Sequence, residues 1–317
     1  MLGLLGVDPT TYRRSWLHDP DRLYPETNCY ADLLIELLHA AGHEPLACLT
    51  CVLGLALEGD QFTFFKPEPA ALRTLYDLDV HEVQLYRPLI EVAAQQLAAG
   101  KAVLVEVDGF FLPDTAATSY RREHVKTTIA LEALDAAQQR AHYFHNAGLY
   151  NLSGEDFRGA LRVGVPLGSA SLVPYVESAR FGGRALTGDP LRRASAGFAA
   201  EQLAGRSDTN PFLAFADRLP GDLVALADAE PAFAASYTFA TVRMAGSAAT
   251  LAAAYARWLL DDAGEPTAQA LDAVGATCKT LGFRLARRRP FDPQPLLQQA
   301  AAQWDDGLQR LGDALPR

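Results

Sequence analysis

A change in hydrophobic periodicity near the middle of the chain limits the folds open to it. Before about residue 165, short β-prone runs alternate with amphipathic helices, whereas after Asp189 Ala and Leu recur at helical spacing. A helical repeat does not fit a strand, and a two-residue repeat does not fit a helix. We therefore predict an α+β domain at 1–165, a linker at 166–189 and an α-helical domain at 190–317.

The composition of the chain argues against several classes of function. The 317 residues carry a formal net charge of −10, which argues against nucleic acid as a partner because binding phosphate needs a basic surface. No apolar run reaches the roughly 18 residues that predict a membrane span, and the N-terminal residues do not have the pattern of a secretory signal. The four cysteines are too few and too scattered for a disulfide framework. We expect free thiols in a cytoplasmic protein without a membrane partner.

The first long helix is predicted to begin at Cys29. Apolar residues recur at helical spacing up to Ala41, and Gly42 then ends the pattern. Thr27 and Asn28 stand where helix caps belong. Cys29 would lie in the first turn, where free N–H groups and the helix dipole stabilise a thiolate, the nucleophilic form of cysteine. A cysteine at such a position is also commonly a small buried residue, and the pattern alone leaves both readings open.

A base for this cysteine would have to come from the strands that follow. The run 102–108 predicts a strand that ends at Asp108, and the runs 124–135 and 140–150 predict a hairpin. His124 opens the first strand of that hairpin, and Asn146 lies late in the second. Alternation along a strand places Asp108 on the face opposite the valines, where it either points toward a cleft or is solvated.

Other polar and sulfur-containing groups have plainer interpretations. Cys48 and Cys51 form a CxxC pair without a second ligand pair, which favours buried core cysteines over a metal site. Arg122 either meets an anionic ligand such as a pantetheine phosphate or lies in a solvated loop. The basic run at 284–289 either docks an acidic partner or complements the dipole at the end of a helix. No metal site is predicted.

Four runs carry a resemblance to a known family. They are, in order, NCYADLLIELLHAAG, LAAGKAVLVEVDGFFLPD, YRREHVKTTIALEALD and HYFHNAG. In order and spacing they resemble the N-terminal domain of the butirosin biosynthesis protein H family, over roughly residues 15–160, and the likeness is closer still to an uncharacterised bacterial family of this type. The resemblance implies a papain-like, or peptidase-C39-like, cysteine domain in which an antiparallel sheet packs on a central helix, followed by a helical accessory domain.

The same resemblance implies an activity and a set of roles. It implies a cysteine acyltransferase that takes an acyl or aminoacyl group from the phosphopantetheine thioester of a carrier protein and passes it to an amine, with no cofactor bound to the enzyme. Cys29 would be the nucleophile, His124 the general acid and base, and Asn146 the residue that orients His124. Papain-like peptidases use a Gln before the cysteine at the oxyanion site, and residues 20–28 contain none, so Thr27 or Asn28 would substitute.

Two alternatives remain open at this point. A cysteine hydrolase, either a peptidase or an amidase, would use the same three residues with water in place of the amine. A catalytically silent module that binds a carrier protein would keep the fold without the chemistry. The distance between the Cys29 sulfur and the His124 ring decides whether the enzymatic readings are possible.

Overall fold

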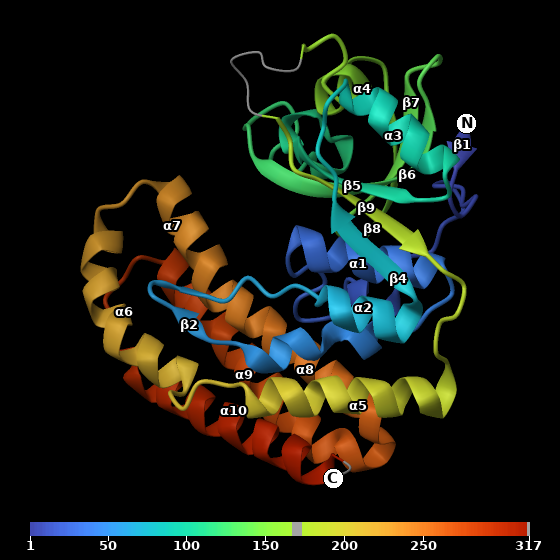
Figure 1. The fold of residues 1–317 in the computed structure, drawn as a ribbon. Coiled ribbons are helices and arrows are strands. Elements are labelled where there is room, and N and C mark those ends of the chain that lie inside the picture. The colour runs from blue at the N-terminus through green and yellow to red at the C-terminus, as the bar shows by residue number, and fades with distance from the viewer. Residues whose placement is uncertain (167–172, 316–317) are drawn as a thin grey trace. The chain divides into compact units, whose positions relative to one another are not determined.

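The computed structural model describes residues 1–166 and 173–315 and divides into two compact units (Figure 1). The sheet unit comprises Met1–Asp19, Cys29–Pro45 and Leu72–Leu186. The helical unit comprises Pro20–Asn28, Leu46–Ala71 and the chain from Thr187 onward. The chain therefore passes between the units several times, and one of these passages lies between Asn28 and Cys29.

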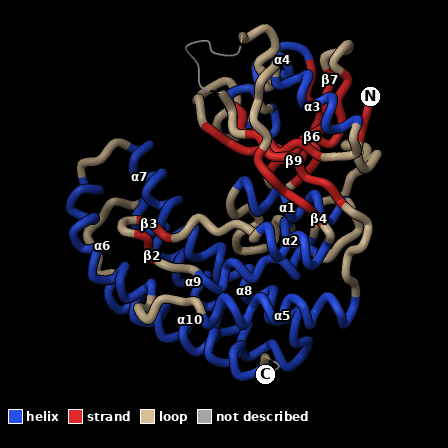
Figure 2. Tube along the Cα trace, viewed as in Figure 1, coloured by secondary structure: helices blue, strands red, loops and turns tan. Residues whose placement is uncertain are grey.

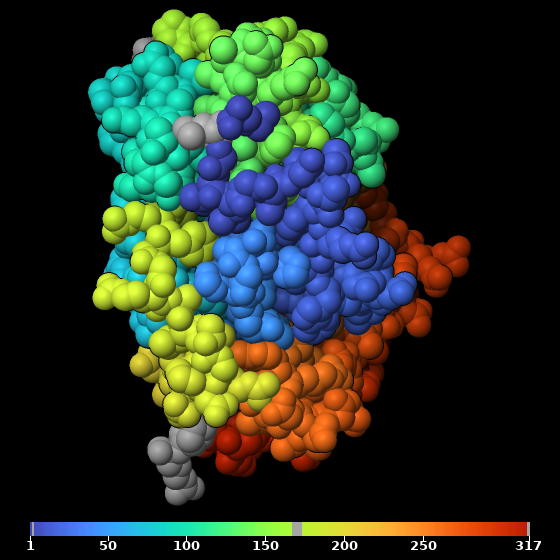
Figure 3. All heavy atoms as spheres, turned by 90° about the vertical axis from the view of Figure 1, so that its right-hand side faces the viewer, coloured from blue at the N-terminus to red at the C-terminus, as the bar shows by residue number. Residues whose placement is uncertain are grey.

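The sheet unit is built on a seven-stranded sheet in which every strand pair is antiparallel (Figure 2). The strand order is β4-β9-β5-β6-β7-β8, and β1 also pairs with β6. The first residues, dark blue in Figure 3, accordingly lie against the green atoms of the sheet. The strands are β1 (Leu2–Gly3), β4 (Leu78–Glu82), β5 (Ala102–Asp108), β6 (Lys126–Asp135), β7 (Arg140–His145), β8 (Gly148–Ser153) and β9 (Val176–Phe181).

Helices cover both faces of this sheet. α3 (Leu89–Ala98) and α4 (Gly154–Ala160) pack with Val103, Val105 and Val107 of β5 in one hydrophobic core. α1 (Cys29–Ala40) packs against β6, β7 and β8 on the other face. Because successive side chains of a strand point to opposite faces, Glu106 and Asp108 of β5 share the face that α1 covers. This face carries the polar residues described below.

The helical unit consists mainly of helices that follow Thr187. They are α5 (Gly188–Ala204), α6 (Pro211–Ala227), α7 (Pro231–Thr238), a π-helical turn at Phe239–Arg243, α8 (Met244–Leu260), α9 (Glu265–Ala286) and α10 (Gln294–Ala314). α8 and α9 pack closely because position 275 lacks a side chain: a Cβ there would lie 2.6 Å from Thr250 Cγ2. A short hairpin of β2 (Leu57–Glu58) and β3 (Gln61–Phe62) also belongs to this unit, as does the kinked 3₁₀ segment Pro45–Gly54 from Leu46 onward. The passage from the helical to the sheet unit at Ala71 lies within α2 (Pro69–Tyr76).

A mixed α/β region with an antiparallel sheet, followed by a helical region, confirms the coarse fold predicted from the sequence. The predicted boundaries differ from the observed ones. β9 lies inside the segment predicted as a linker at 166–189, of which residues 167–172 lie outside the described residues, and the sheet unit extends to Leu186. Pairing of β9 with β4 and β5 joins residues far apart in the chain, so no local pattern reveals it. Within the described ranges, no helix is both long and apolar enough to cross a membrane.

Candidate active site

Cys29 is the first residue of α1, as the sequence predicts. Its thiol is free and half-buried, and Sγ lies 3.9 Å from Oγ1 of Thr128 on β6. The sulfur therefore faces a polar side chain of the sheet and is not enclosed in hydrocarbon. A first-turn position also leaves backbone N–H groups without partners within the helix, and these groups stabilise negative charge nearby.

His124 lies two residues before β6 and is held by Asp108, the last residue of β5. The two atoms His124 Nδ1 and Asp108 Oδ2 are 2.6 Å apart. The strand register explains this contact, because Asp108 lies directly opposite Lys126, and Lys126 is itself paired with Glu106 at 3.0 Å. An ionised carboxylate only accepts hydrogen bonds, so Nδ1 donates, and Nε2 of the neutral ring is left as the basic nitrogen.

An aromatic ring fixes the imidazole from a second direction. Phe110 stacks on His124 with a centroid distance of 4.5 Å and an interplanar angle of 15°. The guanidinium of Arg121 lies 5.5 Å from the centre of the Phe110 ring and is tied to Asp156 at 2.6 Å. The hydrogen bond to Asp108 and the stack together limit rotation of the imidazole, although 72% of its side-chain surface is exposed.

The nucleophile and the base lie on the same face of the sheet. Thr128, which contacts the sulfur, pairs across the strands with Glu106, and the next pair on that face joins Lys126 to Asp108. No hydrogen bond joins the Cys29 sulfur directly to the His124 ring among the described residues. Catalytic hydrogen bonds are commonly long or absent without substrate and shorten when it binds. Cys29, His124 and Asp108 thus form a candidate nucleophile, base and orienting group.

The structure corrects the role predicted for Asn146. Asn146 lies in the tight turn between β7 and β8 with a φ of 43°, a conformation that Asn tolerates better than most residues. Among the described residues it forms no hydrogen bond with His124, whose ring nitrogen is bonded to Asp108 instead. The group in contact with the His124 ring is therefore a carboxylate from β5. The neighbouring His145 is buried and bonded through its two ring nitrogens to Asp114 and Thr127.

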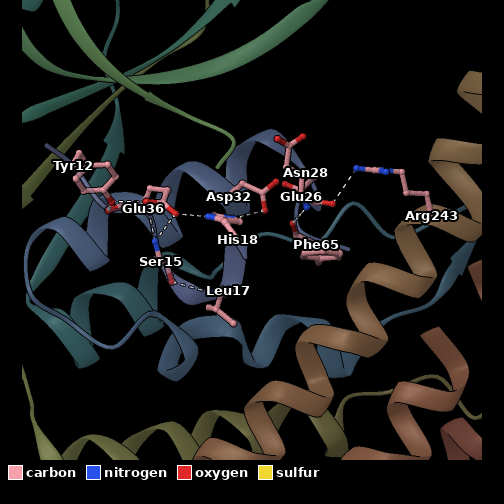
Figure 4. Close-up of polar contacts among 10 residues, drawn as sticks. All are labelled: Tyr12, Ser15, Leu17, His18, Glu26, Asn28, Asp32, Glu36, Phe65 and Arg243. Atoms are coloured by element: carbon pink, nitrogen blue, oxygen red, sulfur yellow. Dashed lines mark hydrogen bonds and ion pairs between the residues drawn. The ribbon is translucent and has the colours of Figure 1, made fainter. Parts of the chain in front are cut away.

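The residues predicted to bind substrate have other contacts. Asn28 is buried in the helical unit, and its Nδ2 donates to the backbone oxygen of Phe65 at 3.0 Å (Figure 4). Thr27 beside it is also buried. Arg122 is exposed, and its Nη1 donates to the backbone oxygen of Ala117 at 3.4 Å. Asp108 belongs to the site as the partner of His124. None of these contacts identifies an oxyanion-binding side chain.

The remaining three cysteines form no disulfide. Cys48 and Cys278 are buried, as the sequence suggests, whereas Cys51 is partly exposed. Burial raises the pKa of Cys278 to about 12, and burial followed by the proximity of Cys48 raises the pKa of Cys51. No group of three or more potential metal ligands occurs in the part of the chain that the structure describes.

Sequence reasoning missed a buried ionic cluster in the sheet unit (Figure 4). The two ring nitrogens of His18 contact Glu36 and Asp32 of α1, the latter at 3.3 Å, and Tyr12 donates to Glu36 as well. Burial alone would lower the pKa of His18, but the hydrogen bonds and charges of the two carboxylates raise it to about 9. The cluster anchors the N-terminal segment on α1. The sequence did contain one signal for this cluster: Asp32 and Glu36 lie four residues apart within an otherwise apolar helix. Two buried carboxylates need a positively charged partner, but the sequence does not show that His18 is that partner.

The fold and the site define a two-part protein: a mixed α/β unit with a cysteine, a histidine and an aspartate on one face of its sheet, and a helical unit. The chain belongs to the DUF1839 family. The DUF1839 N-terminal domain matches residues 13–181, and the DUF1839 C-terminal domain matches residues 188–313. The gap between the two matches coincides with the passage between the units at Leu186. Comparison with curated proteins gave no match.

Proposed function

We propose that this protein is a papain-like cysteine acyltransferase related to the butirosin biosynthesis protein H family. One observation carries the proposal: a free cysteine heads the helix that covers the sheet, on the same face as a histidine held by a carboxylate. Nucleophile, base and orienting group are the three parts that cysteine acyl transfer requires. The antiparallel sheet packed on the cysteine-bearing helix is also the arrangement expected of a papain-like domain.

The proposed reaction has two half-reactions through one covalent intermediate. The Cys29 thiolate attacks the thioester carbonyl of an acyl or aminoacyl carrier protein, the bond to the pantetheine sulfur breaks, and that sulfur takes a proton from His124. An amine then attacks the acyl-Cys29 thioester, gives its proton to His124, and releases the Cys29 sulfur. Exchange between thioesters is nearly isoenergetic, so positioning and charge stabilisation are the main demands on the protein.

The charges at the site are suited to this cycle. Asp108 keeps Nδ1 of His124 protonated and stabilises the imidazolium that forms whenever Nε2 takes a proton. The backbone N–H of Cys29 is at the first turn of α1, where it is free to donate to the oxyanion of a tetrahedral intermediate. The sequence-predicted oxyanion donor Asn28 instead uses its amide to hold Phe65. The backbone donor is therefore the better candidate.

A cysteine hydrolase is the second candidate, and the exposure of His124 favours it. With 72% of the histidine side chain exposed, water has access to the base that would activate it. The same three residues would then cleave a peptide or amide, and water would release the acyl group from Cys29. The two functions differ in the molecule that accepts the acyl group, which is an amine or water. An experiment that compares loss of the acyl group with and without amines therefore distinguishes them.

Intact mass spectrometry of the full chain tests the proposal. Incubation with an acyl-loaded carrier protein should give a hydroxylamine-labile adduct on the wild type and on Cys51→Ala, and none on Cys29→Ala. Candidate amines should then accelerate loss of the adduct and yield an amide product. Loss at one rate with and without amines would support the hydrolase, and no adduct from several acyl donors would contradict both enzymatic functions.

A further inference from the structure

A group of five exposed cations lies at the end of α9 and in the residues that follow it. We call this group the basic stripe; it comprises Lys279, Arg284, Arg287, Arg288 and Arg289. Phe283 lies among them with 60% of its surface exposed. The opposite face of the helix is buried through Cys278, Leu281 and Leu285, so packing fixes the side of α9 on which the stripe lies.

No residue of the basic stripe forms an ion pair within residues 1–166 and 173–315. Other arginines of the helical unit do: Arg257 pairs with Glu265 and Asp272, each at 2.8 Å, and Arg310 pairs with Asp306 at the same distance. The sequence holds no acidic residue between Asp272 and Asp292. In a chain of net charge −10, the stripe is thus a local surface without balancing carboxylates.

The helix dipole explains only part of this concentration of charge. α9 ends at Ala286, and the effect of the dipole is confined to about the last turn, so Arg288 and Arg289 lie beyond the helix end. Arg284 and the C-cap residue Arg287 are three residues apart on the last turn of α9, a spacing at which like charges repel. An unpaired cluster of this kind lowers stability unless a partner supplies the negative charge.

We propose that the basic stripe docks an acidic protein surface, and that in the proposed reaction this surface belongs to the carrier protein that delivers the acyl group. Arginine and aromatic residues together are the side chains most enriched at the centres of protein interfaces, which fits four arginines around Phe283. The opposite charges of the stripe and an acidic partner would attract and orient the partner as it approaches.

Two variants with the same change in charge test the docking surface. The triple variant Arg284→Gln, Arg287→Gln and Arg288→Gln neutralises the stripe, and a control triple variant neutralises three paired arginines of the helical unit. The control substitutions are Arg206→Gln, Arg218→Gln and Arg310→Gln. Fluorescence anisotropy with a labelled, phosphopantetheinylated acyl carrier protein should show affinity at least roughly tenfold weaker for the stripe variant, with a smaller dependence on salt. Equal affinities of the stripe variant and the wild type, or no binding by the wild type, would overturn the proposal.

The docking proposal rests on the proposed function, and acylation by two different donors tests the two separately. Acylation of Cys29 by the carrier protein should slow in the stripe variant through a higher KM, whereas acylation by free acyl-pantetheine should be unchanged. Equal slowing with both donors would contradict docking and point to damage to the site. Failure of both donors with the wild type would refute the acyltransferase, and the anisotropy measurement would still decide whether the stripe binds an acidic protein.

Discussion

Replacing Asp108 with Asn removes the charge beside His124 and the acceptor for its Nδ1 while it keeps the local backbone. Asp108 Oδ1 also accepts a hydrogen bond from the backbone N–H of Phe110 at 3.0 Å, and the amide oxygen of Asn can accept that bond equally well. The substitution should therefore keep the turn after β5, but it places the donor Nδ2 of Asn against Nδ1 of His124, so it removes the charge and also the acceptor that keeps Nε2 as the basic nitrogen. A matched control is Asn146→Ala, which tests the orienting residue that the sequence predicted.

The magnitude follows from the contact between the two side chains. A hydrogen bond to a charged group contributes about 1.5–3 kcal/mol, and about 1.4 kcal/mol corresponds to a factor of ten in rate. Because the ring is largely exposed, solvent screens the charge and the lower part of this range applies. Loss of this interaction alone predicts that Asp108→Asn acylates Cys29 at least about 10-fold more slowly, and Asn146→Ala should react at nearly the wild-type rate.

The assay is single-turnover acylation of Cys29 by acyl-pantetheine, followed by quenched intact mass spectrometry. Thermal unfolding of each variant checks that the fold is retained. The reasoning would be refuted if Asp108→Asn reacted as fast as the wild type, or if Asn146→Ala reacted more slowly than Asp108→Asn.

Three further predictions concern the reactivity of Cys29, the charge of His18 and the ring of Phe110. Cys29 should react with iodoacetamide well below the pH at which Cys278 does, because burial raises the pKa of Cys278 to about 12; peptide mapping that finds equal rates would contradict this. Since the pKa of His18 is raised from 6.5 to about 9, its contribution of up to about 3 kcal/mol should be complete below pH 6.5 and lost as the pH rises through 9. Urea unfolding from pH 6 to 10 should show that loss in the wild type and a flatter curve in His18→Gln; parallel curves would refute it. Phe110→Ala removes a stack on His124 that contributes about 0.5–1.5 kcal/mol, so acylation of Cys29 should slow about 2- to 10-fold, and an unchanged rate would show that the stack is dispensable.

The elements that local pattern controls were predictable. Apolar spacing and the Gly42 stop located the helix that begins at Cys29, and valine alternation located β5 and placed Asp108 on the face opposite the valines. Proline in the first turn of α9 and of α10 is a helix-start signal that the sequence contains.

What depends on long-range pairing was not predictable. β9 lies between two strands that precede it by many residues, so its position depends on pairing and not on its own composition. Asp108 contacts His124 because the register of β5 on β6 brings the two residues together, and the sequence contains no sign of that register. Asn146 occupies its position for a local reason, the left-handed turn between β7 and β8.

The proposed chemistry requires Cys29 and His124 to act as a pair, and the pH profile of Cys29 alkylation in His124→Gln measures this without any substrate. If the imidazole activates the sulfur, the variant should alkylate at least roughly tenfold more slowly than the wild type at pH 7 and approach the wild-type rate only in alkali. Superimposable profiles of the two proteins from pH 5 to pH 10 would contradict the enzymatic account.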